Sequence, residues 1–421
     1  MKKPKLRAAS VIGMPSIFET ISRDTQNTKH AGWQELEDDL NAKEQTPSVC
    51  LPTMVGPAGH AHRTRSAKKA KRFSIHRKRK NNHHRSHRQL PMLSELNATS
   101  ERELTSLYAC HTLKAINKLA KGWERKFRKK VLAAIKHRII PQDMREKIEA
   151  LLVGIGATSV PVLTNRKARR IAHQSLHKQL CGLAKNDPDF EVAIVTFISG
   201  DGATSHARPV IELCHSQAQM KATLRAMAPD FFGINEMALF NSHAHPEGGQ
   251  ILQVHGHALI FGKNVHHNAQ RVAVKHMSKF TENMTGAPQI DVRTVKTDKV
   301  NLARVCAYLF KAPYRCMTWC PPKDGKKGHM HGSEKGDRKL RYFRMAQIQS
   351  MLTIEDICFA GGPNGKRIKS DLFKLLKTTC QADCAGTDRI FHPDAIGAFT
   401  VEVAKALGKN DWTLPVIAKR K

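Results

Sequence analysis

Residues 253–261 read QVHGHALIF, and this stretch decides how the rest of the chain is interpreted. Successive side chains of a β-strand point to opposite faces, so a strand here places His255 and His257 on the same face. Val254 and Ala258 then face the other way, towards a core. Two imidazoles on one face of a sheet can bind a single divalent metal ion. Taken alone, the pair is equally consistent with two surface histidines on a strand.

A second strand, residues 231–240 (FFGINEMALF), precedes the histidines, and the polar loop 241–249 joins it to a strand at 250–261. Such a connection predicts an antiparallel hairpin. Glu236 lies on the earlier strand, and it faces the two histidines if the register of the hairpin allows. A carboxylate would then supply the third ligand that a metal site needs.

Outward from this hairpin, strands and helices alternate along the chain. Residues 191–198 (EVAIVTFI) and 289–295 are rich in β-branched residues and predict two more strands. Helical patterns are expected at 209–227, 265–283 and 300–311. The order β-α-β-β-α-β-α predicts an α+β fold with a ferredoxin-like, RRM-like antiparallel sheet and helices on one face.

The last of these helices contains CAYLFKAPY, in which Lys311 follows Tyr308 by three residues. Side chains at this spacing share one helix face. An amine beside a phenol favours the phenolate, or neutralises charge on a phosphate. Taken alone, Tyr-x-x-Lys also fits an ordinary core or surface tyrosine.

The charge of the chain indicates a polyanionic partner. The 421 residues contain 70 Lys and Arg against 36 Asp and Glu, a formal net charge of +34. Residues 63–88 hold 12 Lys or Arg and no acid, and 114–138 hold ten against Glu124. We expect the first run to contact phosphates from a disordered arm, with a functionless solvated tail as the alternative. The second is either a DNA-binding helix or an amphipathic helix whose polar face is basic.

These patterns divide the chain into four parts. The predicted parts are a disordered basic arm (1–95), a basic helical accessory region (96–186), an α+β domain (187–320) and a helical C-terminal region (321–421).

Several classes of protein are excluded or disfavoured. No apolar run approaches the roughly 20 residues of a membrane span, and the basic N-terminus lacks the apolar core of a signal peptide. Ten irregularly spaced cysteines suit a reducing cytoplasm.

Two further candidate sites are weaker. Cys316, Cys320, Cys380 and Cys384 could bind zinc, with unrelated thiols as the alternative. The segment GGPNGK (361–366) lacks the spacing and the Ser or Thr of a phosphate-binding loop.

The order of these motifs resembles the rolling-circle replication initiators of the HUH endonuclease superfamily. The resemblance covers roughly residues 188–315: a Glu-bearing strand, His-x-His, a strand, and a helix with Tyr-x-x-Lys. Gly256 departs from the bulky hydrophobic residue that the family places between the histidines. Tyr314 is six residues from Tyr308, with Pro313 between them, so the chain is similar to the single-tyrosine type.

The resemblance implies site-specific nicking and joining of single-stranded DNA at a replication origin of a plasmid or phage. His255, His257 and Glu236 would hold Mg²⁺ or Mn²⁺, Tyr308 would attack the phosphate, and Lys311 would stabilise the phenolate or the phosphate oxygens. Since no motor ATPase motif is visible, a host helicase and a polymerase are the expected partners. A rolling-circle transposase of the same superfamily and a non-catalytic RRM-like nucleic-acid-binding protein are the alternatives.

Overall fold

The computed structural model describes residues 102–136, 142, 161–241, 250–283, 285, 287–313, 317–320, 329–331, 338–383 and 401–418. All of them belong to one compact unit, His84–Lys421. The predicted basic arm (1–95), the loop 242–249 and Tyr314 lie outside the described residues. No helix of the described part is long and apolar enough to cross a membrane.

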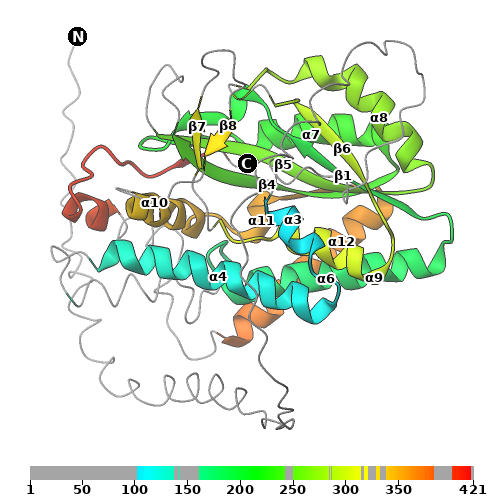
Figure 1. The fold of residues 1–421 in the computed structure, drawn as a ribbon, viewed down its shortest axis with the longest axis horizontal. Coiled ribbons are helices and arrows are strands. Elements are labelled where there is room, and N and C mark those ends of the chain that lie inside the picture. Colours follow the sequence, from blue (N-terminus) through cyan, green and yellow to red (C-terminus); the bar gives the residue numbers. More distant parts are fainter. Residues whose placement is uncertain are drawn as a thin grey trace, which may run out of the picture. The chain divides into compact units, whose positions relative to one another are not determined.

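The centre of the unit is an antiparallel sheet built from the four strands that the sequence predicts. They are β1 (Glu191–Phe197), β4 (Asp230–Asn241), β5 (Gln250–Gly262) and β6 (Ile290–Val295). The strands lie side by side in the order β6-β1-β5-β4 (Figure 1). The prediction of an α+β fold with an antiparallel sheet is therefore confirmed.

Short strands that the sequence analysis did not predict enlarge this sheet to eight. They are β2 (Ala203–Ser205), β7 (Met317–Cys320), β8 (His329–His331) and β9 (Cys358–Gly361). β2 pairs with β5, β9 pairs with β4, and β7 and β8 continue the sheet beyond β4. The β4–β7 pairing is parallel. The strand order of the whole sheet thus differs from that of a four-stranded ferredoxin-like fold.

Helices cover both faces of the sheet, so the prediction of helices on one face is wrong (Figure 1). On one face lie α7 (Leu213–Met227) and α8 (Val265–His276). The other face carries α3 (Arg102–Tyr108), α4 (Leu113–Ile135), α6 (Arg166–Asn186), α9 (Lys299–Leu309), α10 (Arg338–Ser350), α11 (Ile354–Ile357) and α12 (Gly362–Asp383). The reason is visible in β1, whose residues 192–197 are all buried, as a strand covered on both sides requires.

The predicted accessory region, residues 96–186, shares a core with the sheet. Trp123 and Phe127 of α4 and Leu176 of α6 belong to the same buried apolar cluster as Ile194 of β1 and Leu259 of β5. Helix α4 turns its apolar stripe inwards while Lys118, Lys121, Arg125 and Lys129 are exposed. The basic helix is therefore amphipathic, with its charge on the surface and its apolar face in the core.

Candidate metal centre

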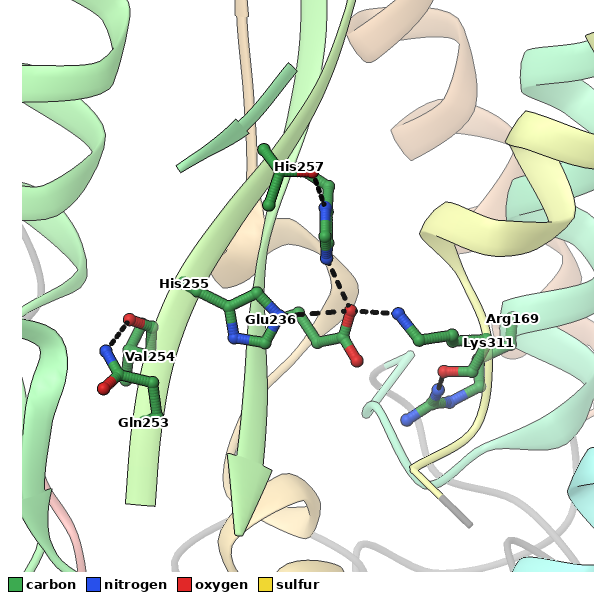
Figure 2. Close-up of polar contacts among 8 residues, drawn as sticks. Arg169, Glu236, Gln253, Val254, His255, His257 and Lys311 are labelled. Atoms are coloured by element: carbon green, nitrogen blue, oxygen red, sulfur yellow. Dashed lines mark hydrogen bonds and ion pairs between the residues drawn. The ribbon is translucent and has the colours of Figure 1, made fainter. Parts of the chain in front are cut away.

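The register between β4 and β5 places Glu236 directly opposite His255. His257 is two residues farther along β5 and therefore lies on the same face. Glu236 Oε2 is 3.5 Å from His255 Nε2 and 3.0 Å from His257 Nε2. One ligand atom from each of the three side chains lies within 4.8 Å of the others. The hairpin register therefore brings Glu236 to the two histidines, as the sequence analysis required. These three residues form a group that could bind a metal ion (Figure 2).

A threonine on the third strand orients His257. Thr196 of β1 lies opposite His257 of β5, and its Oγ1 is 3.1 Å from His257 Nδ1. This contact turns the other ring nitrogen, Nε2, towards Glu236. A hydrogen bond to the second ring nitrogen is the usual way in which proteins fix a metal-binding histidine.

The electrostatics of His257 also suit a metal ligand. Burial lowers the pKa of His257 to about 4, although the hydrogen bond to the Glu236 carboxylate opposes this change. The ring is therefore neutral at pH 7. Its buried Nε2 lies 3.0 Å from Glu236 Oε2. A neutral imidazole beside a carboxylate is a donor set that suits a divalent cation.

Lys311, immediately after α9, donates a hydrogen bond to Glu236 Oε2 (Figure 2). Burial raises the pKa of Glu236, but the Lys311 ammonium and the hydrogen bonds from His255 and His257 outweigh burial and hold it well below its usual range. Glu236 is therefore ionised. The predicted lysine therefore contacts the carboxylate of the candidate metal-binding group as well as the tyrosine.

Tyr308 of α9 lies beside the same group. Its ring centroid is 4.9 Å from that of His257, with an interplanar angle of 71°. Lys311 Nζ lies over the tyrosine ring at 3.9 Å from its centroid. Tyr308 is 4% exposed. The structure thus brings together all five residues that the sequence analysis selected. The helix predicted to reach residue 311 ends at Leu309, however, so Lys311 comes from the segment after α9 and does not share a helix face with Tyr308.

Arg169 of α6 is a further residue of this region, and sequence reasoning missed it. The sequence groups it with the basic residues that open α6, whereas the structure buries it. Its Nη1 donates to the Lys311 carbonyl oxygen at 2.6 Å (Figure 2). Its Nη2 donates to Gln349 Oε1 at 2.7 Å. The helical spacing could have indicated that Arg169 is buried, because Arg169 is three residues before Ala172 and four before His173, which lie on the buried face of α6.

Gly256, the residue between the two histidines, is explained by Met220 of α7. A Cβ atom at Gly256 would lie 2.0 Å from Met220 Sδ and 3.0 Å from Met220 Cε. Met220 is buried, so its thioether fills the space that a bulky side chain at position 256 would need. A side chain from another element thus occupies the space beside Gly256.

Four further histidines and the GGPNGK segment make other contacts, are exposed, or lie outside the described residues. His266 Nε2 is 2.8 Å from the Val192 carbonyl oxygen, and His267 is exposed. His243 and His245 are not among the described residues. In the GGPNGK segment, the Asp230 carboxylate accepts hydrogen bonds from the backbone N–H groups of Asn364 and Gly365 at the start of α12. An aspartate thus takes the place that a phosphate would need.

The structure describes two of the four cysteines that were candidate zinc ligands. Cys320 and Cys380 are free thiols, whereas Cys316 and Cys384 lie outside the described residues. Within the described ranges, Glu236, His255 and His257 form the group of His, Cys, Asp or Glu residues with metal-binding spacing.

Comparison with protein-family models, with curated proteins and with solved structures finds no match to this chain. The chemistry of the site is therefore argued from its own residues.

Proposed function

We propose that this protein is a metal-dependent endonuclease that nicks and rejoins single-stranded DNA through a tyrosine nucleophile, as a rolling-circle replication initiator of the HUH superfamily does. One observation carries the proposal. Glu236, His255 and His257 form a metal-binding group, and Tyr308 packs against His257 while Lys311 contacts both Glu236 and Tyr308. The segment from β1 to α9 is, in this proposal, a ferredoxin-like core extended by the additional strands.

Each residue has a defined role in the proposed reaction. The Tyr308 oxygen forms a bond to the phosphorus as the bond from phosphorus to the 3′ oxygen breaks. The products are a 5′-phosphotyrosine and a 3′-hydroxyl that takes up a proton. One phosphoester replaces another, so the reverse attack by a 3′-hydroxyl rejoins the strand. Glu236, His255 and His257 would hold a divalent cation, which would polarise the scissile phosphate when bound. The Lys311 ammonium favours the phenolate of Tyr308.

The proposed reaction requires Tyr308 to become accessible, because only 4% of it is exposed. DNA binding must therefore move α9 or the segment that covers it. Hydrogen–deuterium exchange of residues 299–311 with and without single-stranded DNA measures this change, and faster exchange in the complex is expected.

The RRM-like alternative is disfavoured by the aromatic residues of the sheet. An RRM stacks bases on exposed strand aromatics. Here Phe197, Phe231, Phe232, Phe261 and Phe359 are all buried. These five phenylalanines therefore offer no stacking platform to a nucleic acid.

The test is formation of a covalent DNA adduct. The full-length protein is incubated with Mn²⁺ and a single-stranded library of random sequence that is labelled at its 3′ end, and adducts are resolved on a denaturing gel. Tyr308→Phe is expected to abolish the adduct. Tyr342→Phe, which changes a buried tyrosine on α10, is the matched control and is expected to retain it. An adduct that persists in Tyr308→Phe would show that another residue is the nucleophile.

A further inference from the structure

A continuous row of basic side chains runs along the outer side of α4. Its members are all exposed: Lys114, Lys118, Lys121, Arg125 and Lys129. They follow one another at intervals of three or four residues, so a rotation of about 100° per residue places them within an arc of about 80°. With a rise of about 1.5 Å per residue, the row is about 22 Å long. We call this row the α4 basic face.

No carboxylate of the described part of the chain neutralises the α4 basic face. Glu124 is the one acidic residue of α4, and it lies 4.0 Å from Arg169 of α6 instead. The described ion pairs of lysine and arginine otherwise involve Lys263, Arg293 and Lys311, which lie on other elements. The positive charge of this face is therefore uncompensated within the described chain.

The arrangement of charge on α4 opposes the stability of the helix. The basic face contains four successive pairs at a spacing of three or four residues, and like charges at this spacing repel one another. Lys114 lies in the first turn, where the helix dipole favours an acid, and the first turn contains none. The last turn, where the dipole favours a cation, contains no basic residue. Helix stability therefore does not account for the row, whereas a polyanionic partner would relieve its repulsion.

The apolar side of α4 restricts the kind of polyanion. Trp123 and Phe127, the aromatic residues of α4, are buried, so this helix offers no ring on which the bases of a single strand can stack. A helix that lies in a membrane surface inserts its apolar side among the lipids. Here that side belongs to the core, and α9 and α10 contact α4 (Figure 1). A surface with cations alone suits a partner that presents phosphates alone, which is the backbone of a duplex.

We infer that the α4 basic face binds the phosphate backbone of duplex DNA without regard to sequence. A duplex carries one negative charge per about 1.7 Å of its axis, twice the density of a single strand, so it is the stronger ligand for a straight row of cations. Contacts from Lys and Arg to phosphates position a protein on DNA but do not read its bases. The choice of DNA rather than RNA rests on the proposed function, in which the nicked strand comes from such a duplex. The residues of this face are separate from Glu236, His255, His257 and Tyr308, so duplex binding does not require the reaction.

The test measures duplex binding in a variant that loses three charges of the face. The variant combines Lys118→Gln, Lys121→Gln and Arg125→Gln, because glutamine is a good helix former without charge. A labelled blunt duplex of random sequence is titrated with the full-length protein by fluorescence anisotropy, in excess EDTA and at several salt concentrations. Affinity is expected to fall at least about tenfold, and the slope of log affinity against log salt by about two, since each phosphate contact contributes about 0.9.

The matched control loses the same two lysines and one arginine from the opposite side of the sheet. It combines exposed residues of α7, α8 and the segment after α8: Arg225→Gln, Lys275→Gln and Lys279→Gln. Its affinity is expected to fall about twofold or less, because the net charge changes equally but no phosphate contact is lost. A second variant, Lys118→Arg with Lys121→Arg, keeps both charges and is expected to bind within about twofold of the unmodified chain. Circular dichroism checks that each variant keeps its helical content.

The same titration with other polyanions tests the choice of duplex DNA. A single strand of equal length is expected to lose at most about threefold in the basic-face variant, because its charge density is half as great. A loss of duplex binding no larger than in the control would overturn the inference. An equal loss for the single strand, for duplex RNA or for vesicles of anionic lipid would overturn the assignment to duplex DNA.

The inference and the proposed function fail separately. A covalent adduct at Tyr308, together with duplex binding that ignores Lys118, Lys121 and Arg125, would remove the α4 basic face alone. Duplex binding that depends on these three side chains, without any adduct, would remove the nicking reaction alone.

Discussion

The two faces of the central sheet are built from alternate residues of the same strands, yet their chemistry differs. Towards α7 and α8 the strands present Ala193, Val195, Ala258 and Ile260, which belong to one buried apolar cluster. Towards α6 and α9 the same strands present Thr196, His255, His257 and Glu236, which meet Lys311 and Arg169. One face is held by packing alone, whereas the other combines an apolar core with a group of buried charges that compensate one another.

This difference predicts which kind of substitution each face tolerates. Burying a charge is costly unless it is paired and hydrogen-bonded, so the charged face is sensitive to the loss of any single partner. The apolar face is sensitive to volume instead. Four sets of substitutions separate these two sensitivities.

The largest effect on stability is expected from Arg169→Met. The guanidinium is buried, donates to Lys311 and Gln349, and lies 4.0 Å from Glu124 Oε1. Burial raises the pKa of Glu124, and the Arg169 charge opposes this rise. Without Arg169 the acceptors lose their donor, at a cost of about 3 to 5 kcal/mol of unfolding free energy. Urea unfolding followed by tryptophan fluorescence measures the change.

Arg170→Met provides the matched control, because Arg170 is the next residue and is exposed. It removes the same charge from the same helix turn and is expected to change the unfolding free energy by less than about 0.5 kcal/mol. Equal effects of the two substitutions would show that net charge, rather than the buried contacts, accounts for the result.

Arg169 also marks the limit of what the sequence could predict. Alternation along QVHGHALIF was enough to place His255 and His257 on one face, and the hairpin brought Glu236 opposite them. Both placements depend only on residues that are close in the sequence or on two strands joined by a single connection. The contact between Arg169 and the Lys311 carbonyl joins residues 142 positions apart, and no local pattern encodes it.

The unpredicted parts of the sheet have a similar explanation. β9 is four residues long and pairs with β4, more than a hundred residues earlier in the chain. Segments this short carry too few residues for an alternating pattern, so their pairing depends on the completed fold. The covering of both faces was visible in the continuous apolar run of β1, which a one-sided sheet does not need.

The next largest effect concerns metal binding. His257→Ala and Glu236→Gln each remove one of three ligands, and each is expected to weaken Mn²⁺ binding at least about 100-fold, or about 2.7 kcal/mol. Thr196→Val keeps all three ligands but removes the contact that orients His257, and about tenfold weaker binding is expected. Isothermal titration calorimetry measures all three variants.

His267→Ala, which replaces an exposed histidine on α8, is the control and is expected to bind Mn²⁺ as the unmodified chain does. Retention of full affinity by His257→Ala would exclude it as a ligand.

The apolar face is tested by Gly256→Ala. The added Cβ would lie 2.0 Å from Met220 Sδ, so a buried side chain must move, at a cost of about 1 to 3 kcal/mol in unfolding free energy. Mn²⁺ affinity is expected to change little, because the methyl group points away from the two histidines. Gly182→Ala on α6, where nothing lies within 4 Å of the new Cβ, is expected to stabilise the chain by up to about 1 kcal/mol.

A double-mutant cycle identifies Met220 as the obstacle. In a Met220→Ala background the space at position 256 is free, so Gly256→Ala is expected to cost at least about 1 kcal/mol less than it does alone. If the two effects simply add, the clash with Met220 does not explain the glycine.

The smallest effect is expected from Lys311→Met, and its direction is opposite to that of the ligand substitutions. The Lys311 ammonium occupies an oxygen of Glu236 and places a positive charge beside the metal-binding group. Removing this charge relieves its repulsion of a cation and frees the carboxylate oxygen, so Mn²⁺ is expected to bind about tenfold more tightly, or by about 1.4 kcal/mol. The same variant is expected to form less DNA adduct, because Tyr308 loses its ammonium neighbour. Lys296→Met removes an exposed charge before α9 and is expected to alter neither quantity. Weaker Mn²⁺ binding in Lys311→Met would show that the lysine orients Glu236 for the metal rather than competing with it.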